Sequence, residues 1–140
     1  MLTVLTASAV STADRYSAYI ARFKDVAIRH QQQFGIPASI TLAQGLLESG
    51  AGAGTLAVNA NNHFGIKCHG WSGRAVNHDD DALGECFRAY NHAGQSYEDH
   101  CQFHRGGRRY RGIFDLDRND YRGWARGLKA AGYATNPNYA

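Results

Sequence analysis

Apolar side chains recur at helical spacing in the first quarter of the chain. Between charged residues they fall at Tyr16, Ile20, Phe23, Ala27 and Phe34. This spacing predicts an amphipathic helix over residues 16–34. Asp14 is a suitable N-cap, and Gly35 and Pro37 end this helix and begin the next.

A second apolar run lies between Pro37 and Gly50. Its apolar residues occupy most of the circumference of a helix and are Ile40, Leu42, Ala43, Leu46 and Leu47. A helix of this kind is expected to be central and buried. The following "GTLAVNANN" predicts one short helical turn before a loop.

Short extended segments then interrupt the helical pattern. Residues 63–71 and 73–81 read as strands, and "DALG" reads as a turn into "ECFRAY". Helical spacing resumes over residues 95–106 and 119–132, the last helix with Asn119 as its cap and Gly132 as its stop. The pattern predicts a mainly helical α+β protein with one small inserted hairpin.

Length and composition indicate one globular domain. The chain has 140 residues, of which 44% are hydrophobic and 19% charged. Its formal charge of +3 would favour an anionic surface or polymer, but dedicated nucleic-acid binders are usually more basic. Eight Tyr and two Trp beside 16 Gly suggest a groove with aromatic walls.

The N-terminal stretch "MLTVLTASAVSTA" lacks a basic region and is short for a complete secretory signal. We expect residues 1–15 to form a disordered leader, with the remnant of a trimmed signal as the alternative, and residues 16–140 to form the domain. No other run approaches the roughly 20 apolar residues of a membrane span.

Glu48 stands at the end of the second predicted helix. The negative end of the helix dipole disfavours a carboxylate there, and Leu46 and Leu47 make partial desolvation plausible. Both effects would raise its pKa, and a carboxylic acid still protonated near neutral pH is what general-acid cleavage of a glycosidic bond requires. The alternative is a solvated glutamate at a helix end.

A second carboxylate often accompanies such an acid. Asp79, Asp80, Asp81 and Glu85 cluster in the predicted hairpin. Strand alternation would send Asp79 and Asp81 to one face and Asp80 to the other. A solvated turn or a weak cation site is the alternative for the three adjacent aspartates.

Several motifs in order resemble one known family. "ITLAQGLLESGAGAGTLA", "NNHFGIK", "FRAY", "SYEDH" and "WARGLKAAGYATNPNYA" are similar to the glucosaminidase family of bacterial peptidoglycan hydrolases, glycoside hydrolase family 73. The resemblance runs from about Tyr19 to the last residue. It implies a lysozyme-like, mostly helical, two-lobed fold with the hairpin beside a groove, and endo-cleavage of the N-acetylglucosaminyl-β-1,4-N-acetylmuramic acid bond of peptidoglycan.

The resemblance also assigns roles to residues. Glu48 matches the catalytic acid, and Tyr133 matches a tyrosine of the catalytic cleft. Asn62, Phe64 and Gly65 match a segment that forms groove floor and scaffold. We further expect Tyr90, Tyr110 and Tyr139 to contact the substrate.

This chain departs from the family pattern at the second carboxylate. Many members carry a threonine and a second glutamate in a longer flap, where this chain has "NHDDDALGECFRAY". The turn of the hairpin places Asp81 nearest that glutamate, with Asp80 and Glu85 as competitors. In some related enzymes the N-acetyl group of the substrate attacks instead, and none of the three would then be essential.

The resemblance bears on the cysteines and on the chain end. Cys68 and Cys86 flank the hairpin and could form a disulfide in an exported protein, whereas Cys101 on an apolar helix face is expected to be a buried thiol. The chain stops at "NPNYA", where family members usually continue into another helix, so we expect a trimmed protein or a fragment. A secreted, periplasmic or cell-wall location, a monomeric state and no cofactor are the matching expectations.

Other functions compete with this interpretation. Seven histidines suggest a metal hydrolase as one alternative. Their spacing matches neither "HExxH" nor paired "CxxC" ligands, and we expect no metal. A glycan-binding module without catalysis is a second alternative, and a transglycosylase or muramidase acting on the neighbouring bond is a third. "RGGRRYR" could contact nucleic acid through phosphates, but we expect mostly solvated arginines, with one or two touching peptidoglycan.

Overall fold

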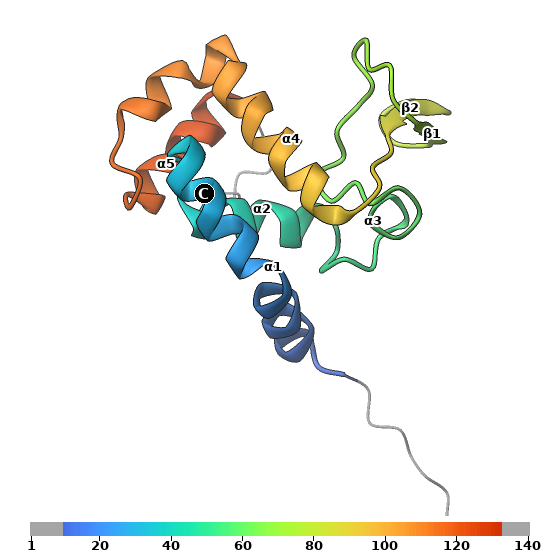
Figure 1. Ribbon diagram of the computed structural model, residues 1–140, viewed down its shortest axis with the longest axis horizontal. Coiled ribbons are helices and arrows are strands. Elements are labelled where there is room, and N and C mark those ends of the chain that lie inside the picture. The colour runs from blue at the N-terminus through green and yellow to red at the C-terminus, as the bar shows by residue number, and fades with distance from the viewer. Residues whose placement is uncertain (1–9, 133–140) are drawn as a thin grey trace, which may run out of the picture.

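The computed structural model describes residues 10–132 (Figure 1). Its elements in chain order are α1 (Thr12–Phe34), α2 (Ala38–Glu48), α3 (Thr55–Ala60), β1 (Ala75–His78), β2 (Glu85–Arg88), α4 (Ala93–Gly106), the 3-10 helix η1 (Arg108–Asp115) and α5 (Tyr121–Ala130). The predicted mainly helical α+β class is confirmed.

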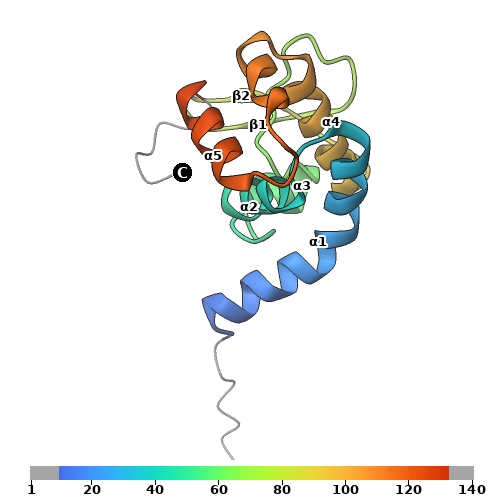
Figure 2. The ribbon, with the colours of Figure 1, turned by 90° about the vertical axis from the view of Figure 1, so that its left-hand side faces the viewer.

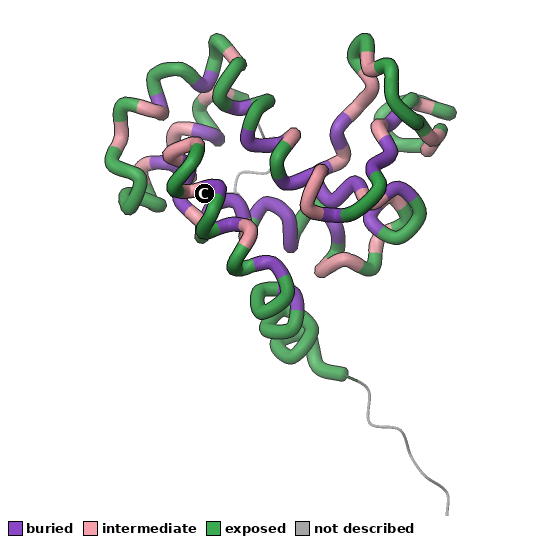
Figure 3. Tube along the Cα trace, in the orientation of Figure 1, coloured by how far each residue is buried: buried purple, intermediate pink, exposed green. Residues whose placement is uncertain are grey.

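The elements form two lobes joined by α2 and α4. In Figure 1, η1 and α5 lie at one end of α4, and α3 and the hairpin lie at its other end, while α2 runs beneath it. Figure 2 shows the first turns of α1 projecting away from this body. Buried positions gather in α2 and on the faces of α1 and α4 turned toward it (Figure 3).

Each lobe has its own apolar cluster. The cluster on the hairpin side contains Tyr19, Phe23, Leu46, Phe64, Ile66, Ala93 and Tyr97. The cluster on the η1 and α5 side contains Ile36, Ile40, Cys101, Tyr110, Ile113, Trp124 and Leu128. Because α2 and α4 contribute to both clusters, these two helices form the shared frame of the lobes.

At Gly45 the central helix α2 lies unusually close to α1 and α4. A Cβ atom there would lie 2.6 Å from the Tyr97 hydroxyl and 2.8 Å from the Tyr19 hydroxyl. These two hydroxyls hydrogen-bond to each other, and the Tyr19 hydroxyl also contacts His63 Nδ1 at 2.8 Å. The absence of a side chain at position 45 is therefore what allows α1 and α4 to close on α2.

Several predicted boundaries need correction. The first helix begins at Thr12, and Ser11 caps it by accepting a hydrogen bond from the Asp14 backbone N–H, so Asp14 is not the cap. The boundary predicted between residues 15 and 16 thus lies inside α1, while residues 1–9 fall outside the described part. At the last helix the cap is Asp120 rather than Asn119.

The central helix is less completely buried than its composition suggests. Ala43 is exposed, and Leu47 is 59% exposed. Both residues line a small cavity beside α5. The predicted position of α2 at the centre of the protein is nevertheless confirmed by its buried residues, among them Ile40, Gly45 and Leu46.

The sequence pattern missed the 3-10 helix η1. It lies in the arginine-rich stretch that we expected to be a solvated loop. Its Tyr110 and Ile113 are 1% and 8% exposed and pack into the cluster of the η1 and α5 lobe. This burial removes Tyr110 from the surface that a substrate could contact, which corrects its expected role.

The hairpin is short and is reinforced at its base. β1 and β2 pair antiparallel, with Ala75 opposite Arg88 and His78 opposite Glu85. The preceding segment joins the hairpin by one bridge between Lys67 and Phe87 rather than as a full strand. A disulfide links Cys68 to Cys86, and Cys101 is a buried thiol in α4.

Of the helices described, none combines the length and apolar character that crossing a bilayer would require.

The close contact at Gly45 generates a stability prediction. Gly45→Ala adds a methyl group where two buried tyrosine hydroxyls already lie, and overpacking of this kind costs about 1–3 kcal/mol. We expect this cost to exceed the gain of up to about 1 kcal/mol in helix propensity. Urea unfolding of the two proteins measures the difference in free energy of unfolding.

Gly106→Ala is the matched control, because a Cβ atom on that helical glycine would meet no other part of the protein within 4 Å. It should leave stability unchanged or raise it slightly. Equal effects of the two substitutions would contradict the packing role of Gly45.

Candidate active site

A cavity of about 390 Å³ lies where the end of α2 meets the gap between the lobes. Glu48 lines it from α2, and residues 64–67 with His69 and Asp81 line it from the hairpin side. The opposite wall is formed by His100 and Phe103 of α4 and by Arg109 of η1. The cavity is therefore built from both lobes and has a single carboxyl group from the central helix.

Glu48 is placed by the way in which α2 ends. It is the last helical residue, and Ser49 follows as the C-cap with its backbone N–H directed to the Gly45 and Leu47 carbonyls. The chain then turns sharply, with Gly50, Ala51 and Gly52 all at positive φ. This turn leaves the Glu48 side chain at the cavity rather than against a continuing helix.

Two causes raise the pKa of the Glu48 carboxyl above its ordinary value. The larger is desolvation by the protein around the cavity, and the second is the negative charge of Asp80. The residue as a whole is exposed, because the cavity is open, yet the protein packed around the carboxyl removes part of its water and so disfavours the ionised form. Glu48 is thus suited to donate a proton.

The acidic residues of the hairpin differ in their surroundings. Asp79, Asp80 and Asp81 lie beyond the end of β1, so the strand alternation expected for them does not apply. Asp79 accepts a hydrogen bond from the Gly84 backbone N–H at 2.7 Å and closes the turn. Asp80 acts on Glu48 through its charge, and Asp81 lines the cavity.

Lys67 forms ion pairs with two of the acidic residues of the hairpin, Asp81 and Glu85. Its Nζ lies 2.8 Å from Glu85 Oε2 and 3.4 Å from Asp81 Oδ2. The hydrogen bond from Lys67 is the main cause that lowers the pKa of Glu85, which also accepts from the Ala82 backbone N–H. Glu85 is therefore held as a structural anion, whereas the Asp81 side chain remains 86% exposed.

The predicted groove-floor residues divide between scaffold and lining. Asn62 is 1% exposed; its side-chain oxygen accepts from the Ile66 N–H, and its NH₂ donates to the carbonyls of Ile66 and Arg88. It acts as scaffold and does not line the cavity. Phe64 and Gly65 do line the cavity, and Phe64 stacks on His100 with ring centroids 3.9 Å apart.

Tyr90 lies away from Glu48. It is 4% exposed, its hydroxyl donates to Asp99, and it lines a cavity other than the one at Glu48, so its expected contact with the substrate stays a prediction. Tyr133 and Tyr139 lie outside the described residues. The cavity residues that the sequence interpretation did not single out include Lys67, Phe103 and His100, although Lys67 stands inside the quoted "NNHFGIK" motif.

Within residues 10–132, no group of three or more His, Cys, Asp or Glu side chains is arranged to hold a metal ion. The buried histidines pack against aromatic rings, and His63 also contacts the Tyr19 hydroxyl. Burial lowers the pKa of His63 to about 4 and that of His104 to about 3, so both rings are neutral near pH 7.

Comparison with known proteins gives a consistent set of similarities. The glucosaminidase family model, described as mannosyl-glycoprotein endo-beta-N-acetylglucosaminidase, matches residues 24–140. The exo-glucosaminidase LytG of Bacillus subtilis is 34% identical over 122 residues, which cover 78% of this chain and 42% of LytG. The peptidoglycan hydrolase FlgJ of Vibrio parahaemolyticus is 31% identical over 139 residues, covering 91% of this chain and 45% of FlgJ.

A solved structure shows the same architecture. The peptidoglycan hydrolase from Sphingomonas sp. A1 superposes with a TM-score of 0.73 at 30% sequence identity, covering 87% of this chain and 81% of that one. The chain spans less than half the length of the two curated relatives above.

The charge of Asp80 generates a prediction about Glu48. Asp80→Asn removes a negative charge that raises the pKa of Glu48, so that pKa should fall. Titration of the Glu48 side-chain carboxyl carbon by NMR measures the change. Asp79→Asn is the matched control, because it keeps an oxygen for the Gly84 N–H. An unchanged Glu48 pKa in Asp80→Asn would mean that desolvation alone sets it.

Proposed function

The chain belongs to the glucosaminidase family, and from this membership we propose that it is a peptidoglycan hydrolase that cleaves the N-acetylglucosaminyl-β-1,4-N-acetylmuramic acid bond within glycan strands. The observation that carries the proposal is the Glu48 carboxyl, with its raised pKa, at a cavity shared by the two lobes. The names of similar proteins, LytG and FlgJ, support a substrate of this class. The fold similarity bears out the expected lysozyme-like architecture.

In the proposed reaction Glu48 donates its proton to the glycosidic oxygen, which leaves as the 4-hydroxyl of N-acetylmuramic acid. The bond from that oxygen to C1 of N-acetylglucosamine breaks, and water supplies the new hydroxyl at C1. The positive charge that develops on the sugar ring is stabilised by the negative charge of the hairpin aspartates. The neutral acid and the charged aspartates thus have separate roles.

Asp81 is our choice for the residue that positions water. It lines the cavity and is mostly exposed, so it can reach a bound water or sugar. Glu85 is a weaker choice because Lys67 and the Ala82 N–H already engage both of its oxygens. Asp80 acts chiefly on the Glu48 pKa. Attack by the acetamido group of the substrate is the other route, and it would leave Asp81 dispensable.

We also propose that the protein works outside the cytoplasmic membrane, in the periplasm or at the cell wall. The Cys68–Cys86 disulfide supports this location, because such bonds persist mainly in oxidising compartments. Peptidoglycan, the proposed substrate, is also found there.

Glu48→Gln tests the proposed acid. The change is nearly isosteric and removes the proton donor, so release of fragments from purified peptidoglycan should fall by about 100- to 10,000-fold. Mass spectrometry of the fragments released by the wild type should show N-acetylglucosamine at the reducing end.

Other results would redirect the proposal. Muramic acid at the reducing end would move cleavage to the neighbouring bond, and an anhydro product would indicate a transglycosylase. An active Glu48→Gln protein would reject Glu48 as the acid. A wild type that binds peptidoglycan and releases nothing would indicate a binding module.

Asp81→Asn separates the two routes of displacement. If Asp81 positions water, kcat should fall by about 100-fold or more. Glu85→Gln should have a smaller effect, because Glu85 is expected to act only through Lys67 and the turn. Initial rates on peptidoglycan measure both, and full activity of Asp81→Asn would favour attack by the acetamido group.

A further inference from the structure

The cavity at Glu48 has walls of unlike charge, and the proposed reaction uses only the acidic one. Asp81 lines the cavity on the hairpin side, within the turn that also carries Asp80. Arg109 of η1 lines it on the facing side. A permanently charged guanidinium therefore shares the cavity with the proposed acid, and the reaction described above gives it no role.

The charge of the whole chain is divided in the same way. Residues 101–132 carry eight Lys and Arg against three Asp, whereas the other residues carry seven Lys and Arg against nine Asp and Glu. In Figure 1 these residues form the end of α4 together with η1 and α5. The net positive charge of the protein is thus concentrated in one lobe, on the side of the cavity that Arg109 lines.

The position of Arg109 is set by the buried residue that follows it. Tyr110 is 1% exposed and packs into the apolar cluster of the η1 and α5 lobe. The guanidinium carbon of Arg109 lies 4.8 Å from the centroid of the Tyr110 ring, within the range of a cation–π contact. After burial, the charge of Arg109 is also the second cause that lowers the pKa of His104 in α4. A fixed aromatic ring thus supports a long side chain at the cavity.

Arg109 is exposed and has no carboxylate partner in the part of the chain that the structure describes. None of the ion pairs found among residues 10–132 includes it. A guanidinium carries five N–H donors and stays charged throughout the pH range in which proteins are folded. Its charge and its donors are therefore available to an anionic group that enters the cavity.

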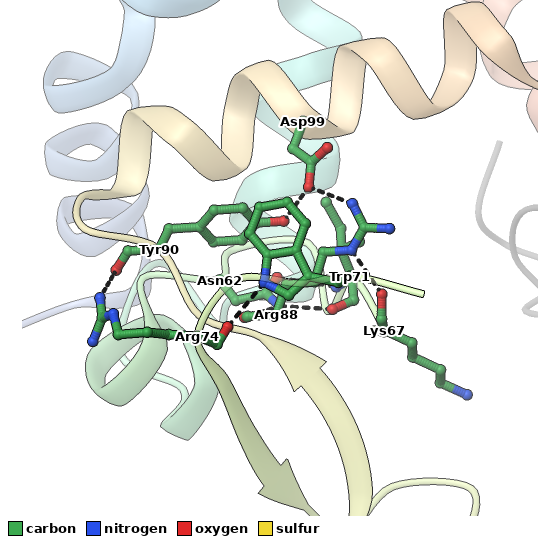
Figure 4. Close-up of polar contacts among 8 residues, drawn as sticks. Asn62, Lys67, Trp71, Arg74, Arg88, Tyr90 and Asp99 are labelled. Carbon is green, nitrogen blue, oxygen red and sulfur yellow. Dashed lines mark hydrogen bonds and ion pairs between the residues drawn. The ribbon is translucent and has the colours of Figure 1, made fainter. Parts of the chain in front are cut away.

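Two other basic side chains that line the cavity are less suited to an anion. Lys67 Nζ already lies 2.8 Å from Glu85 Oε2 and 3.4 Å from Asp81 Oδ2. The Lys67 carbonyl accepts from Arg88 Nε at 3.0 Å, and in Figure 4 the ammonium group points away from that bond. Burial lowers the pKa of His100, so its ring is neutral near pH 7.

The chemistry of the proposed substrate supplies such an anion. N-acetylmuramic acid differs from N-acetylglucosamine by a lactyl ether on O3, which ends in a carboxylate where no stem peptide is attached. In the proposed reaction O4 of N-acetylmuramic acid is the leaving oxygen, so the lactyl group stands on the neighbouring carbon. A carboxylate brought this close to Glu48 loses water and needs a cation, and a guanidinium matches it with two parallel hydrogen bonds.

We propose that Arg109 is a specificity-determining residue, which binds a carboxylate of the muramic acid unit on the leaving side of the cleaved bond. The inference rests on the proposed function for the identity of the substrate. The carboxylate has two sources of the same chemistry, the lactyl group of a peptide-free unit and the stem peptide of a substituted one. His69, which lines the hairpin side of the cavity, is the rival cation.

Substrates that differ only in the carboxylate test the role of Arg109. They are the peptide-free tetrasaccharide of alternating N-acetylglucosamine and N-acetylmuramic acid, its neutral methylamide, and the tetramer of β-1,4-linked N-acetylglucosamine. Arg109→Gln should lower kcat/KM for the first by about 10- to 100-fold, because a charge-assisted hydrogen bond is lost. It should leave kcat/KM for the two neutral substrates unchanged. Arg109→Lys keeps the charge and should retain part of the preference.

Arg111→Gln is the matched control. Arg111 is an exposed arginine of the same 3-10 helix and does not line the cavity, and its replacement changes the net charge by the same amount. It should leave the preference for the charged tetrasaccharide as in the wild type. An equal loss in Arg111→Gln and Arg109→Gln would overturn the proposal, because the basic lobe would then attract anions without a specific contact.

Strands that carry stem peptides distinguish the two sources of the carboxylate. A loss in Arg109→Gln on the peptide-free tetrasaccharide identifies the lactyl carboxylate. A loss on stem-bearing strands alone keeps Arg109 as the carboxylate-binding residue and assigns the carboxylate to the stem peptide.

The remaining outcomes separate this inference from the proposed function. An equal loss on charged and neutral substrates would overturn the role of Arg109, since it would then support only the fold or the shape of the cavity. A preference that survives Arg109→Gln and disappears in His69→Gln would overturn it too. If the wild type cleaves nothing, calorimetry still decides: weaker binding of the tetrasaccharide, but not of its methylamide, to Arg109→Gln keeps the carboxylate site and rejects the hydrolase.

Discussion

The close approach of α1 and α4 to α2 at Gly45 is the contact on which the rest of the structure depends. The hydroxyls of Tyr19 and Tyr97 meet over the bare backbone of Gly45, and His63 completes the group. This cluster fixes α2 one turn before Glu48. The proposed acid is therefore carried by a closely packed helix, and such packing holds a functional side chain in a fixed geometry.

The hairpin side of the candidate active site is fixed by charged contacts as well as by the apolar packing of Phe64 and Ile66. Asp99 of α4 holds Arg88, Arg88 holds the Lys67 carbonyl, and the Lys67 side chain reaches the acidic turn. A partly buried ion pair of this kind contributes little net stability, but its loss leaves an unpaired charge. The pair is thus better understood as fixing one arrangement of the hairpin against α4 than as strengthening the fold.

Much of this arrangement could be predicted from the sequence, because the relevant signals are local. Helical spacing located α2 and α4, the glycine turn after Glu48 marked the helix end, and the acidic turn marked the hairpin. The position of Tyr110 could not be read in this way, since its neighbours are arginines and its burial comes from Ile113 and from α5 packing in the same cluster. The surroundings of Tyr90 could not be predicted for a similar reason, since its partner Asp99 comes from α4, a separate element of the chain.

The same geometry explains how the pKa of an exposed glutamate is raised, as the proposed role of Glu48 requires. Desolvation is the larger cause of the raised pKa of Glu48, and it arises from cavity walls that both lobes supply. In the proposed function, a sugar that fills the cavity would remove further water from the carboxyl and raise its pKa further. Asp80 acts in the same direction, since its negative charge also disfavours the ionised form. In the proposed reaction, binding of the substrate would therefore favour the protonated form of Glu48 that cleavage needs.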